Sequence, residues 1–254
     1  LIKIIYGKKL IVRTGYNILE FSIKERRGKL KNLTYYLLTQ ISLLFCNKFV
    51  VTSKADKDYM SKHFLLRKDK LVIISNWIIE TKPRQNNKRY ENRLLAVGRL
   101  EKQKNYQSML KFIMGTEFTL DIVGKGSLKK ELSDFALKND ISVNFMGQIN
   151  FSELQELYWD YKYYLMFSDY EGHPKSLIEA MSSGCIPIVK LSRNIEDVVS
   201  DSNGIIVNKE NINTLLTTKK IDSQKLKILS KNALDFSVTN YSIKRILKSE
   251  VDLY

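Results

Sequence analysis

The sequence contains few cysteines and histidines, and this scarcity narrows the chemistry open to it. Its two cysteines, Cys46 and Cys185, lie far apart in apolar sequence, so they offer neither a disulfide framework nor a metal-binding spacing. A reducing cytosol is the default compartment for such a chain. The two histidines, His63 and His173, are also far apart. We therefore expect no bound metal ion.

A long apolar run is also missing. The most apolar stretch, residues 33–45, is interrupted by Thr34, Thr39, Gln40 and Ser42, and it is shorter than the ~20 residues that a membrane-spanning helix needs. We expect neither a transmembrane nor a signal segment. The expected location is cytoplasmic, either in solution or peripheral on the inner face of the membrane.

Length and composition predict a packed globular protein of one large or two small domains, because 44% of the 254 residues are apolar. The chain begins with Leu1, and residues 1–5 read as a strand. We therefore expect the natural N-terminus to be missing from this sequence, together with any function housed before it.

Positive charge is in excess and is concentrated in the first third of the chain. Lys and Arg number 42 against 27 Asp and Glu, and residues 1–80 hold 16 basic and 6 acidic side chains. The asymmetry suggests an anionic partner such as a membrane surface, a phosphorylated acceptor or a nucleic acid. The alternative is a lysine-rich coding background. Because no RNA or DNA motif accompanies the charge, we expect no nucleic-acid partner.

A basic segment, KERRGKLK at residues 24–31, overlaps the start of a predicted apolar and aromatic helix at residues 29–47. Such a combination allows a protein to lie on an anionic bilayer without crossing it. The alternative is an internal helix whose basic end is merely exposed.

Short apolar strands alternate with amphipathic helices from residue 94 onward, which indicates a doubly wound, Rossmann-like parallel sheet covered on both faces. A polar stretch after Ile79 marks a domain boundary. We predict a partial N-terminal α/β domain at 1–79, a linker at 80–92, an α/β domain at 93–240, and a C-terminal helix at 241–254 that can pack back on the first domain. The expected strands are 48–52, 71–74, 94–97, 118–123, 142–145, 163–167, 186–189 and 204–207, and the other expected helices are 55–63, 106–114, 128–139 and 152–160.

The most informative segment is DYEGHPKSLIEAMSSGCIPIV, residues 169–189. Pro174 suits the first position of a helix and Gly184 suits the residue just past its end, so a short helix is predicted between them. Residues 186–189 then read as a buried strand. The segment therefore has the loop, helix and strand order of a nucleotide-binding α/β domain.

The start of this short helix forms a candidate anion site. We expect the N–H groups of Lys175, Ser176 and Leu177 to point outward at the positive end of the helix. Glu179, inside the helix, is placed to accept hydrogen bonds from sugar hydroxyls. His173, just before the helix, can donate a hydrogen bond to a phosphate or sugar with an ordinary pKa near ~6.5, although a lone histidine is more often structural.

A second candidate element follows the strand at 94–97. Gly98 lets the backbone approach a ligand, and Arg99 and Lys104 supply two cations that can neutralise a diphosphate. The alternative, two solvated loop charges, is disfavoured because right-handed crossovers place this loop on the same sheet edge as the short helix.

Two further motifs receive structural interpretations. GKGS at residues 124–127 lacks the spacing of a phosphate-binding loop, so we expect a tight turn with Ser127 as a helix N-cap. Asp56 and Asp58 resemble an acidic metal-binding pair, but they fall in a predicted helix after Ser53. Residues two apart on a helix face different sides, so we expect a capped, solvated first turn.

Together these elements resemble family 4 of the retaining GT-B glycosyltransferases. The matching parts are VGRL…KN at 97–105, GKGSLKKEL at 124–132, FMG at 145–147, SDYEGHPKSLIEAMSSGCIPIV at 168–189 with its E-x7-E spacing, NG at 203–204, and Asn76, which resembles the asparagine that closes the family's N-terminal domain. The resemblance covers nearly the whole chain. It implies a metal-independent transferase that has no resident cofactor, takes a nucleotide-diphosphate-sugar as its donor substrate and retains the anomeric configuration.

The resemblance also implies the roles of individual residues. Arg99 and Lys104 would bind the donor diphosphate, Glu171 would lie against the donor sugar near the reacting carbon, and Glu179 would hold the ribose. The catalytic set is Glu171, Arg99 and Lys104, and the donor-binding set is Gly98, Met146, Gly147, Gly172, His173, Pro174, Lys175, Ser176, Leu177 and Glu179.

The N-terminal part departs from this family. The family's first domain has a glycine-rich first loop and a later histidine. Neither has a counterpart in this sequence, because residues 1–80 resemble only the second half of that domain. Residues 13–16 are loosely matched to acceptor-facing positions. We expect a transferase acting on a glycan or lipid-linked acceptor in polysaccharide or cell-envelope glycan synthesis. The alternative is a non-catalytic nucleotide-sugar-binding subunit or a degenerate paralogue.

Overall fold

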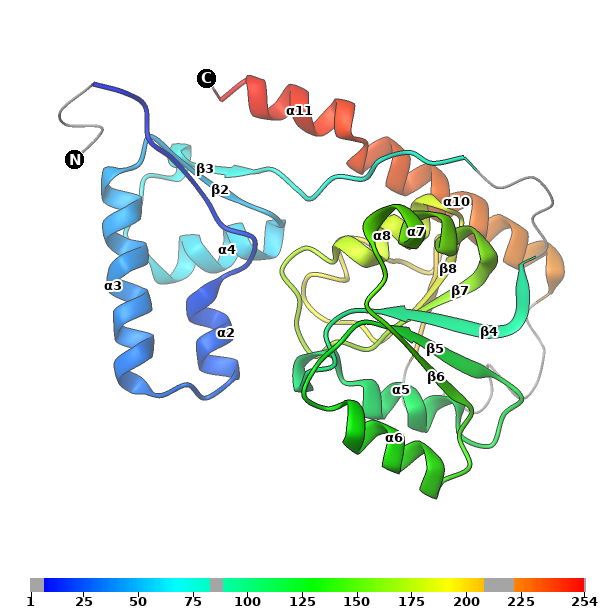
Figure 1. The fold of residues 1–254 in the computed structure, drawn as a ribbon. Helices are drawn as coiled ribbons and strands as arrows, with labels where there is room; N and C mark the ends of the chain where they lie inside the picture. The colour runs from blue at the N-terminus through cyan, green and yellow to red at the C-terminus, as the bar shows by residue number, and fades with distance from the viewer. Residues whose placement is uncertain (1–6, 83–88, 208–221, 254) are drawn as a thin grey trace. The chain divides into compact units, whose positions relative to one another are not determined.

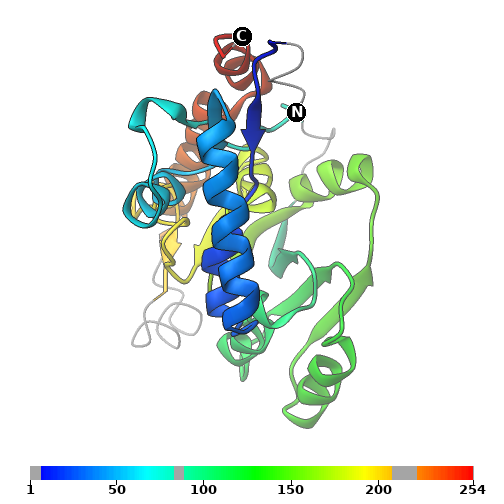
Figure 2. The ribbon, with the colours of Figure 1, turned by 90° about the vertical axis from the view of Figure 1, so that its left-hand side faces the viewer.

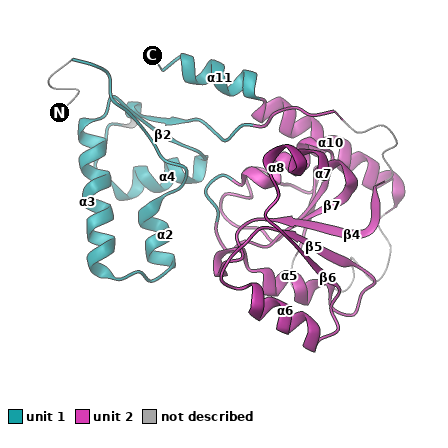
Figure 3. Ribbon diagram, viewed as in Figure 1, with its two compact units in different colours: residues 1–77, 171–173, 243–254 teal, residues 78–170, 174–242 magenta. Residues whose placement is uncertain are grey.

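The computed structural model describes residues 7–82, 89–207 and 222–253. The strand expected at residues 1–5 lies outside this range. The chain divides into two compact units, shown in Figure 3. Unit 1 comprises residues 1–77, 171–173 and 243–254, and unit 2 comprises residues 78–170 and 174–242.

Unit 1 is built on a three-stranded parallel sheet with the order β1-β2-β3. Two of its described helices begin at capped residues, since the side chains of Asn17 and Ser53 accept hydrogen bonds from the backbone N–H groups of Glu20 and Asp56. Its elements are β1 (Ile11–Arg13), β2 (Lys48–Val51), β3 (Leu71–Ile73), α2 (Ile18–Lys24), α3 (Lys29–Phe45), α4 (Lys54–His63) and α11 (Ile243–Val251).

The central strand of unit 1 buries both of its faces. Phe49 and Val51 pack in a cluster with residues of α2, α3 and α4, whereas Val50, between them in sequence, packs with Ile246 of α11. An ion pair between Arg13 of β1 and Glu250 of α11 adds a polar link. The C-terminal helix is therefore part of unit 1.

Unit 2 contains a six-stranded, fully parallel sheet with the order β6-β5-β4-β7-β8-β9. This order is that of a doubly wound Rossmann-like sheet and confirms the predicted fold class. The strands are β4 (Tyr90–Val97), β5 (Thr119–Val123), β6 (Val143–Gly147), β7 (Tyr161–Met166), β8 (Ile186–Val189) and β9 (Ile205–Ile206), and the helices are α5 (Tyr106–Ile113), α6 (Lys129–Lys138), α7 (Phe151–Leu157), α8 (Lys175–Ser182) and α10 (Ser223–Tyr241).

Helices cover both faces of this sheet, as Figure 1 shows. Alternate residues of β4 belong to different buried clusters: Leu94 and Ala96 pack with α5 and α6, whereas Leu95 packs with α7, α8 and α10. Period-two alternation within a continuous apolar strand thus builds two cores.

Several local expectations were wrong. β4 begins at Tyr90, four residues before the expected strand start and inside the expected linker. β1 and α2 were not predicted. Asp56 is buried and accepts a hydrogen bond from the Thr52 hydroxyl, whereas Asp58 is exposed, so the two residues do face different sides but only one is solvated.

Within the described ranges, no helix is both long and apolar enough to cross a membrane. The same residues contain no group of three or more His, Cys, Asp or Glu side chains arranged to hold a metal ion.

Candidate functional site

The order of the unit 2 sheet places the candidate residues on one edge. Strand order reverses between β4 and β7, and ligands of open α/β sheets bind outside the carboxyl ends of the strands at such a switch point. The loop after β4 carries Gly98 and Arg99, and the loop after β7 carries Asp169. The loops after β4 and β7 therefore lie on the same carboxyl edge of the sheet, as expected from the sequence.

Glycines allow the turns after three neighbouring strands to pack against one another. The Gly98 N–H donates to the Val123 carbonyl at 2.9 Å, and the Gly124 N–H donates to the Gly147 carbonyl at 2.7 Å. A Cβ at Gly124 would lie 1.9 Å from the Gly98 carbonyl oxygen, so only glycine fits there. Met146 precedes Gly147 at the end of β6 and is partly buried against the core.

The two cations differ in their surroundings. Lys104 ends a 3₁₀ turn at Lys102–Lys104, and its side chain passes Gly98, where an added Cβ would lie 3.0 Å from the Lys104 Cε. Arg99 is exposed at the tip of the loop. Both charges therefore lie in the loop that follows β4. The Lys104 side chain packs against Gly98, the glycine that begins this loop.

Ser127 does not cap α6, contrary to prediction. Its N–H and hydroxyl donate to Glu101 at 3.1 and 3.0 Å, and these hydrogen bonds lower the pKa of the Glu101 carboxyl. The preceding Gly126 lies so close to Leu100 that a Cβ would meet the Leu100 carbonyl oxygen at 2.4 Å. The GKGS turn is thus an anchor for the loop after β4.

Hydrogen bonds join the loops on the two sides of the switch point. The Asp169 N–H donates to the Gln103 carbonyl at 2.9 Å, the Gln103 side-chain amide donates to the Tyr170 carbonyl at 2.8 Å, and the Asn105 amide donates to the Asp169 carboxylate at 2.9 Å. Sequence reasoning missed Gln103 and Asn105 because it attended to the charged residues of the same stretch.

The start of α8 is held against the end of β4. The Tyr164 hydroxyl donates to the Ser176 hydroxyl at 2.8 Å, which in turn donates to the Val97 carbonyl at 3.3 Å. Pro174 is the N-cap and not the first helical residue. The Leu177 N–H donates to the Pro174 carbonyl at 3.1 Å, so the expectation that it points outward for a ligand was wrong.

The end of α8 matches prediction more closely. Gly184 lies just past the helix with φ +73, its N–H donates to the Met181 carbonyl, and the Cys185 N–H donates to the Ala180 carbonyl. This pair of bonds is a Schellman motif. The Arg89 guanidinium also donates to the Gly184 carbonyl at 2.8 Å, which neutralises the negative end of the helix.

Glu179 is a buried carboxylate with two polar neighbours. Its side chain is among the buried polar groups, with one oxygen 3.9 Å from the Lys175 ammonium and the other accepting a 3.3 Å hydrogen bond from Tyr158. Burial raises the pKa of Glu179, while Lys175 and the Tyr158 hydroxyl act in the opposite direction. A carboxylate fixed in this way keeps acceptor capacity for ligand hydroxyls.

Glu171, Gly172 and His173 pack with unit 1. The Asn76 side chain donates to the His173 carbonyl at 2.8 Å, and a Cβ at Gly172 would lie 2.3 Å from the Gly15 carbonyl oxygen. His173 is 7% exposed, and burial lowers its pKa to about 4. The imidazole is therefore neutral at pH 7, not poised near its ordinary pKa.

The edge of unit 2 combines features suited to a phosphorylated, hydroxyl-bearing ligand. Arg99 and Lys104 supply positive charge, the first turn of α8 supplies the positive end of a helix dipole, and Glu179 supplies a buried acceptor. Glycine turns bring the backbone close to the same edge. Groups of these kinds can bind anions and hydroxyls.

Known proteins share this fold. The structure of Anabaena Alr3699/HepE in complex with UDP and glucose superposes with a TM-score of 0.82 at 16% identity, covering 99% of this chain and 72% of that one. At such low identity the likeness shows the fold alone. It is the GT-B type predicted from the sequence.

Two curated relatives are similar in sequence. The O-antigen biosynthesis glycosyltransferase WbnH of Escherichia coli is 30% identical over 168 residues, which are 64% of this chain and 46% of that protein. The GDP-mannose:cellobiosyl-diphosphopolyprenol alpha-mannosyltransferase of Xanthomonas campestris is 23% identical over 225 residues, which are 84% of this chain and 57% of that protein. The chain thus spans about half the length of the curated relatives it matches.

The family match falls on the part of the chain that builds this sheet edge. Residues 78–232, more than half of the sequence, match the family described as "Glycosyl transferases group 1". That range contains β4, the glycine turns, the Gln103 and Asn105 tether and all of α8. The chain therefore belongs to the glycosyl transferases group 1 family.

Proposed function

We propose that the protein transfers a sugar from a nucleotide-diphosphate-sugar donor to a hydroxyl group of a glycan or lipid-linked acceptor, with retention of anomeric configuration, in polysaccharide or cell-envelope glycan synthesis. The observation that carries the proposal is that the loop with the two cations and the start of α8, the helix that carries the buried Glu179, both lie at the carboxyl edge of the unit 2 sheet. The names of the relatives, which concern O-antigen synthesis and a diphosphopolyprenol acceptor, support the acceptor class.

Arg99 and Lys104 would bind the donor diphosphate and stabilise the charge that develops as it leaves. The first turn of α8, which begins at Lys175, adds its positive dipole end. This positive charge takes the place of a metal ion in the proposed reaction.

Glu179 would accept hydrogen bonds from the ribose hydroxyls of the donor. Its burial supports this role, since a hydrogen bond to a desolvated carboxylate is stronger than one made in water. Glu171 would lie against the donor sugar. In the proposed step, the bond from the anomeric carbon to the diphosphate oxygen breaks, and a bond to the acceptor oxygen forms on the same face of the sugar. The proton of the acceptor hydroxyl passes to the departing diphosphate.

The proposal is tested in two stages on the full chain. A thermal-shift screen of nucleotide-sugars first identifies the donor, because a ligand that binds only the folded state raises the unfolding temperature. Donor turnover is then compared between the wild type and Glu171→Ala, with Glu131→Ala on the exposed face of α6 as the matched control.

We expect Glu171→Ala to lower turnover at least 100-fold and Glu131→Ala to leave it unchanged. Unchanged turnover in Glu171→Ala would refute the catalytic assignment. Donor binding without any turnover by the wild type would instead identify a non-catalytic nucleotide-sugar-binding subunit.

A further inference from the structure

Helix α3 of unit 1 exposes most of its apolar side chains. The helix runs over Lys29–Phe45. Among its described residues, Leu43 alone is buried. Six large aliphatic side chains on the same helix are between 48% and 79% exposed: Leu30, Leu33, Leu37, Leu38, Ile41 and Leu44. Within the described residues, α3 is not covered as an internal helix would be.

These six side chains form a continuous stripe, which we call the α3 face. At 3.6 residues per turn, positions 30, 33, 37, 41 and 44 lie along one side of the helix, and position 38 lies beside them. Figure 2 looks onto α3 (blue) along its full length. A contiguous exposed apolar patch of this kind marks an interaction surface, unlike single exposed leucines.

Positive charge borders the α3 face at its N-terminal end. All residues from 24 to 31 are exposed, and they include five basic side chains and one acidic one. The acidic residue, Glu25, is paired with Arg27. Lys29 and Lys31 lie on opposite sides of the stripe, because each residue advances about 100° around the helix.

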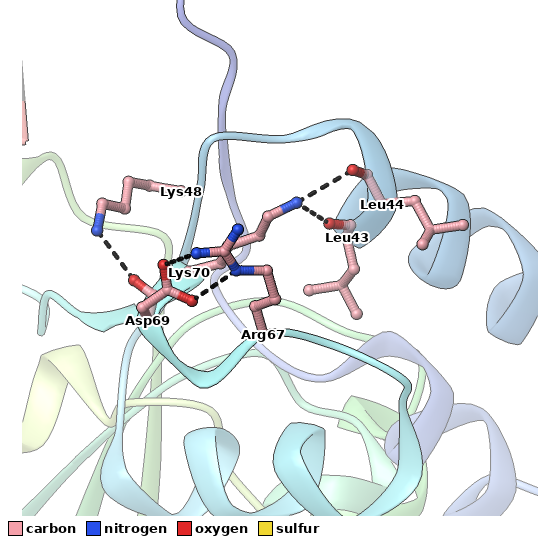
Figure 4. Close-up of polar contacts among 6 residues, drawn as sticks. All are labelled: Leu43, Leu44, Lys48, Arg67, Asp69 and Lys70. Carbon is pink, nitrogen blue, oxygen red and sulfur yellow. Dashed lines mark hydrogen bonds and ion pairs between the residues drawn. The ribbon is translucent and has the colours of Figure 1, made fainter.

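The C-terminal end of the α3 face is also basic, as Figure 4 shows. The Lys70 ammonium donates to the carbonyl oxygens of Leu43 and Leu44 at 3.1 Å each, where a cation is stabilised by the negative end of the helix dipole. Lys48 donates to the Asp69 carbonyl at 2.9 Å, and Arg67 pairs with the Asp69 carboxylate at 3.1 Å.

We infer that the α3 face docks on an anionic lipid bilayer, with the aliphatic stripe at the boundary of headgroups and acyl chains and the basic ends against the headgroups. An amphipathic helix lying in the plane of the membrane has this distribution of apolar and basic side chains. Lipid fits better than a second copy of the chain, because pairing two such faces would bring positive charges together.

This inference goes beyond the proposed sugar transfer and holds whether or not the chain transfers sugar. The α3 face lies entirely within unit 1, whereas the proposed donor contacts of Arg99, Lys104 and Glu179 lie in unit 2. A lipid-binding measurement without donor therefore separates the two proposals.

The test is co-sedimentation of the full chain with vesicles of phosphatidylcholine alone or mixed with phosphatidylglycerol, at 0.1 and 0.5 M salt. Two variants probe the surface: Leu30→Gln with Leu37→Gln and Ile41→Gln, and Lys29→Gln with Lys31→Gln. The matched control is Leu137→Gln with Lys138→Gln on α6 of unit 2, because Leu137 is 85% exposed. Circular dichroism and thermal unfolding verify that each variant folds.

We expect binding to the anionic vesicles only, weakened by the higher salt. The leucine variant should bind at least tenfold more weakly. The lysine variant should bind roughly 25-fold more weakly, since each lysine near an anionic surface contributes about fivefold. The control should bind like the wild type.

Three results would overturn the inference. They are equal binding of the wild type to neutral and anionic vesicles, undiminished binding by a folded leucine variant, and a dimer in light scattering that the leucine substitutions dissociate. The last result would assign the α3 face to a contact between copies of the chain.

Discussion

The Tyr158 hydroxyl donates a 3.3 Å hydrogen bond to the Glu179 carboxylate, and both side chains are buried. Tyr158 begins the 3₁₀ turn between α7 and β7, and Glu179 lies in the middle of α8. The bond therefore fixes one oxygen of the proposed ribose-binding carboxylate from within the core of unit 2. Tyr158 is a positioning residue in this arrangement, since it acts through Glu179.

We predict that Tyr158→Phe weakens donor binding about fivefold, because one hydrogen bond contributes about 1 kcal/mol. The turnover of the bound donor should change little. The measurement is titration calorimetry with the identified donor, combined with the kcat and KM of the variant. Tyr163→Phe, on the opposite face of the sheet, is the control. A lower kcat with unchanged donor affinity would contradict the positioning role.

Glu179→Gln should stabilise the fold at neutral pH while weakening donor binding. Because burial raises the pKa of Glu179, the folded state holds this proton more tightly than the unfolded state. The stability of the wild type therefore falls as the pH rises from the ordinary glutamate pKa to the raised value, and the loss persists above it. Glutamine cannot ionise, so Glu179→Gln does not lose stability as the pH rises.

The measurement is urea unfolding of the wild type and Glu179→Gln from pH 4 to pH 8. We expect the variant's advantage to be absent at pH 4 and to grow as the pH rises. An advantage that is the same at every pH would show that the carboxylate is not desolvated.

His173 should make the fold sensitive to acid. Its folded pKa is about 4, against 6.5 in the unfolded chain, so the stabilisation is complete above pH 6.5 and is lost as the pH falls toward 4. A difference of this size corresponds to about 3 kcal/mol. Urea unfolding of His173→Gln should lack this pH dependence between 6.5 and 4. If the wild type and the variant lose stability in parallel over that interval, His173 is not the acid-sensitive group.

An ion pair with a buried carboxylate should stabilise the amino-terminal side of the unit 2 sheet. Asp121 is fully buried, with Arg93 donating to both carboxylate oxygens at 2.6 and 2.5 Å and Tyr161 donating at 2.7 Å. Arg93→Met leaves this carboxylate without its cation, which should cost about 3 kcal/mol in unfolding free energy.

The matched control is the pair of Lys162 with the exposed carboxylate of Glu91, at 2.6 Å. Glu91→Ala should cost less than about 1 kcal/mol, because water screens an ion pair whose carboxylate is exposed. Both variants are measured by urea unfolding. Equal losses of unfolding free energy in Arg93→Met and Glu91→Ala would contradict the expected difference between the two ion pairs.

Regular patterns in the sequence were sufficient to predict the sheet of unit 2. The apolar run through Leu94, Leu95 and Ala96 indicated a strand buried on both faces, and the structure places these residues alternately in two cores. Parallel strands with right-handed crossovers then required the loops after them, including Gly98, to share one edge. Gly184 likewise marked the end of α8.

Contacts between distant residues could not be predicted in this way. Tyr158 and Glu179 are 21 positions apart, and Gln103 and Tyr170 are 67 apart, so no local spacing indicates either bond. Ser127 was predicted to be an N-cap because serine favours that position. In the structure its hydroxyl instead donates a hydrogen bond to the distant Glu101. The three residues of β1 are too few for a period-two pattern to be recognised.

The most direct test of the central claim is calorimetric titration of the full chain with UDP and GDP, each compared with its nucleoside. We predict that one diphosphate binds and that its nucleoside binds far more weakly. Arg99→Ala with Lys104→Ala should weaken the diphosphate at least 100-fold, because each charge-assisted hydrogen bond contributes about 1.5–3 kcal/mol. Lys130→Ala on α6 should bind like the wild type. Equal affinity of the double variant and the wild type for the diphosphate would contradict the proposed donor site.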